Sequence, residues 1–388
     1  MRIARILTRL NIGGPARTAL SLSARLAAQG HVTALFCGES APREGDLGDE
    51  VPDGVELVRV EGLGRVVNPL RDVTALAALR AKLLAFRPDI VHTHAAKAGT
   101  LGRLAALSLN PRARLVHTYH GHVLSGYFSP WLSRTFTQIE RWLARHTDRL
   151  VAVSPRIRDE LVERFRVGAS SQYRVIPGGV DRLSEAGLER VGARHALGLP
   201  EAGPLVGVIA RLTRIKNHAN LLRALACCGD VPPRLAVVGD GEERERIGEL
   251  AHELGVAPLV QFLGWIDEPR RYIRAFDVVV LPSDAEGLPL VLVEAMAAGG
   301  AVLATAVGGV PDLVTHEVDG LLVPPRDPGA LARALQRLIA DRALRERLGR
   351  AALARATHYT MELHARRISE VYEELLGLPV GSARTAAC

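Results

Sequence analysis

Two glutamates eight positions apart mark the segment of this chain that carries the most chemical information. It reads Ser283-Asp284-Ala285-Glu286-Gly287-Leu288-Pro289-Leu290-Val291-Leu292-Val293-Glu294. Proline is favoured at the first position of a helix. Pro289 therefore predicts that Glu286 lies in the loop before a helix and that Glu294 lies inside it. The backbone from Gly287 to Leu290 would then face a phosphate or sugar at the helix N-terminus.

Glu294 requires a partner, because burying a carboxylate among apolar side chains is costly. Two interpretations stay open from the residues alone. Glu294 either accepts hydrogen bonds from paired hydroxyls of a ligand, such as a ribose, or forms a salt bridge with a nearby arginine.

A second set of charges follows the strand predicted over residues 205–210. Arg211 and Lys216 lie in the loop beyond that strand. Arginine binds a diphosphate through parallel hydrogen bonds and lysine adds a compact charge, so together they would stabilise a leaving diphosphate. Only three of the 49 basic residues are lysines, which favours a specific role for Lys216. The alternatives are a solvated loop and a coding bias.

The turn after the first predicted strand contains Gly13 and Gly14, followed by Pro15. Adjacent glycines let a ligand approach the backbone at a helix N-terminus. An ordinary strand-to-helix turn has the same composition, so this signal is weak alone.

Histidines gather in the first half of the chain, at positions 92, 94, 117, 120 and 122. His92 and His94 alternate on a strand and so face the same side, and Lys97 follows on the next loop. A metal site is disfavoured, because there is no His-Glu-x-x-His pattern and no adjacent acidic ligand. We expect His120 to line a site at the end of its strand and the other histidines to pack or form hydrogen bonds.

Short apolar runs alternate with helical segments, which predicts α/β architecture with parallel sheets and ligands at the carboxyl ends of the strands. The segment 183–199 is the best linker candidate because glycine and proline are frequent there and just beyond it. The predicted strands cover residues 3–10, 32–37, 55–60, 90–94, 115–119, 150–153, 173–176, 205–210, 235–238, 259–263, 278–281, 301–305 and 320–323. From residue 327 onward the chain is expected to be helical.

Charge is uneven along the 388 residues: residues 1–200 carry 28 basic and 18 acidic groups, and residues 201–388 carry 21 and 24. The basic half suggests an anionic partner. Nucleic acid is disfavoured as this partner because aromatic residues make up only 4% of the chain and no binding module is recognisable.

The four cysteines lack CxxC spacing, which favours a reducing compartment. The apolar stretch 287–311 is interrupted by prolines and glycines, which disfavours a membrane-spanning helix. We therefore expect a cytoplasmic protein.

Together these motifs resemble the retaining glycosyltransferases of family 4, which have two Rossmann-like doubly wound domains facing across a cleft (the GT-B fold). The resemblance rests on Glu286 and Glu294, the Arg211/Lys216 pair, the Gly13-Gly14 loop, and two further segments. These are Val237-Val238-Gly239-Asp240-Gly241 and Val175-Ile176-Pro177-Gly178-Gly179-Val180-Asp181. Gly178 replaces a frequent Asn, and Ala301 departs from a frequent Gly-x-Pro-Val pattern.

The resemblance implies an acceptor-side domain over residues 1–182, a donor domain over 200–356, and a C-terminal helix within 358–378 that packs on the first domain. Arg211 and Lys216 would bind the donor diphosphate, Glu294 the ribose, and Glu286 the sugar hydroxyls. The backbone near Leu263 would contact the base. His120 would lie close to the transferred sugar, and Asp240 and Lys97 are further binding candidates.

The implied reaction transfers a hexosyl group from a UDP- or GDP-sugar to an acceptor with retention of configuration, without metal or cofactor. The acceptor is open, lipid-linked or soluble, and the basic first half suggests loose docking on an anionic membrane. An epimerase or hydrolase of the same fold, and a non-catalytic nucleotide-sugar-binding protein, are the competing interpretations.

Overall fold

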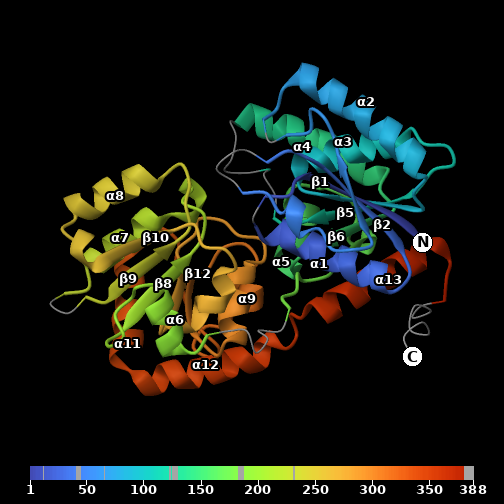
Figure 1. Ribbon diagram of the computed structural model, residues 1–388. Coiled ribbons are helices and arrows are strands. Elements are labelled where there is room, and N and C mark those ends of the chain that lie inside the picture. Colours follow the sequence, from blue (N-terminus) through green and yellow to red (C-terminus); the bar gives the residue numbers. More distant parts are fainter. Residues whose placement is uncertain are drawn as a thin grey trace. The chain divides into compact units, whose positions relative to one another are not determined.

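The computed structural model describes residues 1–11, 13–40, 45–64, 66–121, 124, 130–181, 188–229 and 232–379. In this part of the chain, two parallel sheets carry helices on both faces, and the chain divides into two compact units (Figure 1). Unit 1 contains residues 1–179 and 361–388, and unit 2 contains residues 180–360. The predicted α/β class with two Rossmann-like domains is confirmed.

Unit 1 is built on a seven-stranded sheet of order β3-β2-β1-β4-β5-β6-β7. The order reverses between β1 and β4, as in a doubly wound sheet. Its strands are β1 (Arg2–Arg9), β2 (Val32–Gly38), β3 (Val55–Arg59), β4 (Ile90–His94), β5 (Arg114–Tyr119), β6 (Arg149–Ala152) and β7 (Tyr173–Val175).

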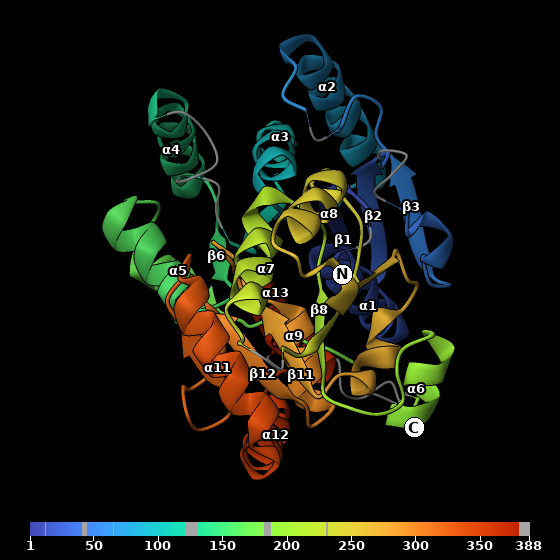
Figure 2. The same cartoon turned by 90° about the vertical axis from the view of Figure 1, so that its left-hand side faces the viewer.

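Helices cover both faces of this sheet. On one face α3 (Ala96–Leu107) lies between α2 (Pro69–Phe86) and α4 (Pro130–Arg145), and on the other α1 (Gly14–Ala28) packs against α13 (Met361–Leu376) (Figures 1 and 2). The short α5 (Pro155–Asp159) follows β6. One face of α1 is buried, with Leu22 and Leu26 in the core shared with α13.

Unit 2 has a six-stranded sheet of order β10-β9-β8-β11-β12-β13, which reverses between β8 and β11. Its strands are β8 (Leu205–Ile209), β9 (Arg234–Val238), β10 (Val260–Gly264), β11 (Val278–Leu281), β12 (Ala301–Thr305) and β13 (Leu321–Val323). Its helices are α6 (Arg190–Ala196), α7 (His218–Ala226), α8 (Arg244–Glu253), α9 (Leu290–Ala297), α10 (Val310–Leu313), α11 (Pro328–Ala340) and α12 (Arg342–Ala356). Two separate apolar cores, one on each face, confirm the doubly wound prediction.

The apolar stretch 287–311 is divided between α9, β12 and the start of α10, as its prolines and glycines predicted. Within the described ranges, no helix is both long enough and apolar enough to cross a membrane.

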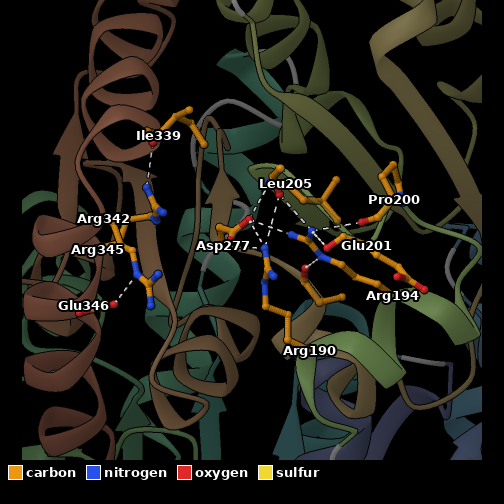
Figure 3. A network of polar contacts seen from close by, with 12 residues as sticks. Arg190, Arg194, Pro200, Glu201, Leu205, Asp277, Ile339, Arg342, Arg345 and Glu346 are labelled. Atoms are coloured by element: carbon orange, nitrogen blue, oxygen red, sulfur yellow. Dashed lines mark hydrogen bonds and ion pairs between the residues drawn. The ribbon is translucent and has the colours of Figure 1, made fainter.

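The predicted linker 183–199 is wrong for the part that the structure describes. Residues 182–187 lie outside the described residues, but α6 forms beyond them and belongs to unit 2. Composition misled here because the contacts that hold the segment are tertiary: Ala193 and Leu199 are buried in a core of unit 2, and the side chain of Arg194 is buried beside them. Arg194 donates from Nε to the carbonyl of Ala275 and from Nη2 to Asp277, at 2.8 Å each (Figure 3).

Arg194 and Arg190 contact the same carboxylate of Asp277 from very different environments (Figure 3). The Arg194 side chain is 0% exposed, whereas that of Arg190 is 45% exposed. Removing a buried partner leaves an uncompensated charge, but an exposed ion pair contributes little.

We therefore expect Arg194→Ala to lower the free energy of unfolding by about 3–5 kcal/mol, and Arg190→Ala by less than about 1 kcal/mol. Urea unfolding of the full chain, followed by fluorescence and circular dichroism, measures both. Equal midpoints for the two variants would contradict the anchoring role of Arg194.

Candidate functional site

The two charged loops of unit 2 are adjacent because they follow neighbouring strands. β8 and β11 pair in parallel, and their carboxyl ends lie at the same edge of the sheet, where the strand order reverses. This is the position at which open α/β sheets bind ligands. The loop after β8 carries Arg211 and Lys216, and the loop after β11 carries Glu286.

Lys216 and Glu286 form an ion pair between these loops. Nζ of Lys216 lies 2.6 Å from Oε1 of Glu286, and the two side chains are only 20% and 9% exposed. The structure thus brings together two of the residues singled out in the sequence. A diphosphate bound at this point would share the ammonium of Lys216 with the carboxylate of Glu286.

Gly308, after β12, positions the backbone of Glu286. Its φ is +50°, and a Cβ on it would lie 1.8 Å from the carbonyl oxygen of Glu286. A side chain at position 308 would therefore push the loop of Glu286 away from the sheet edge.

Two further glycines hold the loop that follows β8. Gly239 and Gly241 have φ values of +131° and +158°, and a Cβ on either would lie within 2.4 Å of a carbonyl oxygen, that of Ala210 or Leu212. The amide of Leu212 donates to the carbonyl of Asp240 at 2.9 Å. The side chain of Asp240 is exposed, and it accepts a hydrogen bond from the amide of Gly241 at 2.8 Å.

Asp284 ties the two charged loops together, a role the sequence analysis missed. Its Oδ1 accepts from Nδ2 of Asn217 at 2.8 Å, and its amide donates to the carbonyl of Ile215 at 2.8 Å. Its Oδ2 pairs with Arg326 at 2.9 Å. In the sequence, the position of Asp284 two residues before Glu286 was the signal that could have indicated this role.

The helix predicted after Glu286 exists, but Pro289 is its N-cap rather than its first residue, with ψ at 105°. Glu294 lies on α9 and is half-buried, so it is less enclosed than its apolar neighbours indicated. Glu294 and the exposed Arg211 each have an interaction partner in the structure. Of the other predicted residues, Gly287 and Pro289 are buried and Leu263, Leu288 and Leu290 are half-buried.

In unit 1, Gly13 and Gly14 begin α1 directly beyond β1. Gly13 is the N-cap, with extended backbone and no side-chain cap. Lys97, in the first turn of α3, has its Nζ 2.6 Å from Oδ1 of Asp72 and donates to the carbonyl of Val66. Two contacts within unit 1 thus hold the ammonium of Lys97.

Four histidines lie on or directly after β4 and β5: His92, His94 and His117 are buried, and His120 is half-buried. His92 and His94 face the same side as predicted, with their rings stacked 4.3 Å apart. Nδ1 of His94 lies 2.9 Å from Nε2 of His120. His117 contacts Thr93 instead, with Nδ1 2.8 Å from Oγ1. His122 lies outside the described residues.

Burial keeps these histidines neutral. It lowers the pKa of His120 to about 3, assisted by the positive charges that His364 and Arg5 would present. Burial likewise lowers the pKa of His92 and of His94 well below the usual value, and Arg5 contributes to both shifts. A neutral imidazole forms hydrogen bonds without contributing a charge. In the described part of the chain, no cluster of three or more His, Cys, Asp or Glu side chains is arranged to hold a metal ion.

Sequence models of two families match the chain in succession. "Glycosyltransferase Family 4" matches residues 12–182, and "Glycosyl transferases group 1" matches residues 192–355. The D-inositol 3-phosphate glycosyltransferase of Corynebacterium jeikeium is 31% identical, over 92% of this chain and 90% of its own length. The UDP-Gal:alpha-D-GlcNAc-diphosphoundecaprenol alpha-1,3-galactosyltransferase of Escherichia coli is 29% identical, over 80% of each chain.

Solved structures show the same fold. Sucrose-phosphate synthase from Thermosynechococcus elongatus is 28% identical with a TM-score of 0.86, covering 97% of this chain and 99% of that one. HepE of Anabaena in complex with UDP-glucose is 23% identical with a TM-score of 0.79, covering 96% and 100%. With both halves matched in order and a relative above 30% identity over nearly its whole length, the chain belongs to the family 4 glycosyltransferases of the GT-B fold.

Proposed function

We propose that this glycosyltransferase moves a hexosyl group from a UDP- or GDP-sugar to an acceptor, with retention of configuration and without a metal ion. The observation that carries the proposal is the Lys216–Glu286 pair at the point where the strand order of unit 2 reverses. A cation for a diphosphate and a carboxylate for sugar hydroxyls are needed side by side in such a site. The name of the relative from E. coli includes UDP-Gal, which favours uracil as the base of the donor.

In this proposal Arg211 and Lys216 bind the diphosphate, and Glu294 binds the ribose. Glu286 binds hydroxyls of the transferred sugar together with the backbone of Gly287–Leu290. The exposed Asp240 and the backbone at Leu263 complete the nucleotide site, and His120 donates a hydrogen bond near the sugar.

The proposed reaction breaks the bond between the anomeric carbon and the diphosphate oxygen while the acceptor oxygen bonds to that carbon on the same face. A phosphate oxygen of the leaving nucleotide takes the proton of the acceptor hydroxyl. Arg211 and Lys216 stabilise the charge that develops on the diphosphate, which is the part a divalent metal would otherwise play.

The acceptor is proposed to be anionic. Residues 1–200 carry a surplus of ten positive charges, and the names of two relatives include inositol 3-phosphate and a diphosphate-linked lipid. A thermal-shift panel of UDP- and GDP-sugars, followed by mass spectrometry with soluble and lipid-linked acceptors, tests donor and acceptor together. Release of nucleotide with no glycosylated acceptor would favour the hydrolase interpretation, and binding without any turnover would favour a binding protein.

Replacing Lys216 by alanine should raise the Kd for UDP about 10- to 100-fold, because one charge-assisted hydrogen bond is lost. Arg214→Ala is the matched control, since Arg214 is an exposed cation in the same 3-10 turn. Isothermal titration with UDP measures both. The site assignment fails if Lys216→Ala binds UDP like Arg214→Ala.

Glu286→Gln separates nucleotide binding from sugar recognition. Removing a negative charge 2.6 Å from Nζ of Lys216 should tighten UDP binding about fivefold, or about 1 kcal/mol. Transfer from the UDP-sugar should fall at least about tenfold, because a ligand for the sugar hydroxyls is weakened. Weaker UDP binding by this variant would place Glu286 on the nucleotide rather than on the sugar.

We also propose that unit 1 docks on an anionic membrane through the start of α2 and the outer face of α4. Val67, Leu70 and Trp131 are 59%, 84% and 73% exposed. Glu140, the one acidic residue of α4, is buried and bonded to Arg103, so the remaining charges of this helix are arginines. Exposed apolar side chains beside arginines suit an anionic lipid surface.

The double variant L70E/W131E should reduce binding to vesicles of phosphatidylglycerol and phosphatidylcholine about tenfold or more, because two apolar contacts are replaced by repelled charges. Leu353→Glu, at an exposed leucine of unit 2, is the control and should bind like the wild type. Sedimentation with the vesicles at low and moderate salt gives the comparison. Undiminished binding of the double variant would remove this surface from consideration.

A further inference from the structure

The buried guanidinium of Arg5 lies against two histidines of β4. Its Nη1 atom is 3.3 Å from Nδ1 of His92 and 3.4 Å from Nε2 of His94. Nε of Arg5 donates to Oγ of Ser23 on α1 at 3.1 Å, which fixes the orientation of the group. Arg5 is 1% exposed, so these contacts form out of solvent.

A guanidinium only donates hydrogen bonds, and this decides where the histidine protons are. Nε2 of His94 faces Nη1 of Arg5 and therefore carries the lone pair. The single proton of this neutral ring is then on Nδ1, which lies 2.9 Å from Nε2 of His120. His94 thus donates to His120, whose own proton is left on Nδ1.

The other branch gives a consistent assignment. Nδ1 of His92 faces Nη1 of Arg5 and accepts a hydrogen bond from it, and it also accepts from the hydroxyl of Tyr372 at 2.6 Å. Its proton is then on Nε2, which lies 2.7 Å from Oγ1 of Thr118. The opposite tautomer at either histidine would bring two donors together.

We infer that Arg5 and His94 are positioning residues that hold His120 as the Nδ1–H tautomer, so that His120 donates this proton in a hydrogen bond to an oxygen of the bound sugar or acceptor. The inference rests on the proposed function for the role of His120 in substrate binding. The tautomer itself follows from contacts within unit 1 and needs no substrate.

The lowered pKa values of His92, His94 and His120 agree with this assignment, because a relay of single protons requires neutral rings. The planes of His94 and His120 differ by only 27° and their centroids are 5.2 Å apart, an edge-to-edge arrangement that suits an in-plane hydrogen bond between the two rings. Tyr372 extends the relay to α13, so the C-terminal helix supports the histidine that lies beside His94.

Nitrogen NMR of the full chain labelled with 15N-histidine tests the tautomer directly. Long-range proton–nitrogen correlations distinguish a protonated Nδ1 from a protonated Nε2, and the signals of His120 are those missing in His120→Gln. We expect protonated Nδ1 for His94 and His120 and protonated Nε2 for His92. A proton on Nε2 of His120 in the ligand-free wild type overturns the inference.

Two variants at position 94 differ by one methylene and test the relay. In His94→Asn the amide nitrogen takes the place of Nδ1 and still donates to His120, so His120 should keep its tautomer. In His94→Gln the amide takes the place of Nε2, and His120 should become a mixture of tautomers. His117→Asn is the control, because His117 is equally buried but bonds to Thr93 instead.

With a UDP-sugar that the panel identifies, His94→Gln should lower kcat about tenfold with little change in KM, and His94→Asn should restore most of it. An unchanged His120 tautomer in His94→Gln overturns the relay. If a thermal melt shows that His94→Gln is not folded, the spectrum of the wild type still tests the tautomer of His120. Since the tautomer is measured without ligand, it stands or falls separately from nucleotide-sugar binding.

Discussion

Close contact between loop backbones at the carboxyl edge of the unit 2 sheet is the constraint on which the candidate donor site depends. Gly239 and Gly241 allow the loop after β9 to touch the loop after β8, and Gly308 allows the loop after β12 to touch Glu286. Any side chain at these positions would overlap a carbonyl oxygen. The charged residues can therefore meet only because neighbouring loops pack without side chains between them.

In unit 1 the corresponding constraint is a buried arginine within the sheet. Neutral imidazoles on the neighbouring strand accept hydrogen bonds from Arg5, and this arrangement orders the protons along β4 as far as His120. Burial that would be costly for an isolated cation becomes useful, because the direction of each hydrogen bond is determined by the single group that cannot accept.

In this structure the positions of individual charges matter more than the net charge of each half of the chain. Lys216 and Arg211 lie in the half of the chain whose net charge is −3, and Lys216 is directly paired with a carboxylate. Net charge therefore says little about the proposed donor site, where two loops determine the field. The surplus in the first half remains relevant to the acceptor and to the exposed arginines of α4.

The sequence by itself determined the class of fold and all thirteen predicted strands in the described chain, because the alternation of short apolar runs with helical segments is local and follows general rules of parallel sheets. It also indicated the family, through the resemblance of its motifs. The sequence misjudged α6, because the burial of Ala193 and Arg194 depends on contacts with residues distant in the chain. It also could not reveal Arg5 as the partner of His92 and His94, or Asp72 as the partner of Lys97. Only the tertiary structure decided these, because such pairings join residues distant in the chain, and hydrogen-bond direction depends on which atoms face each other.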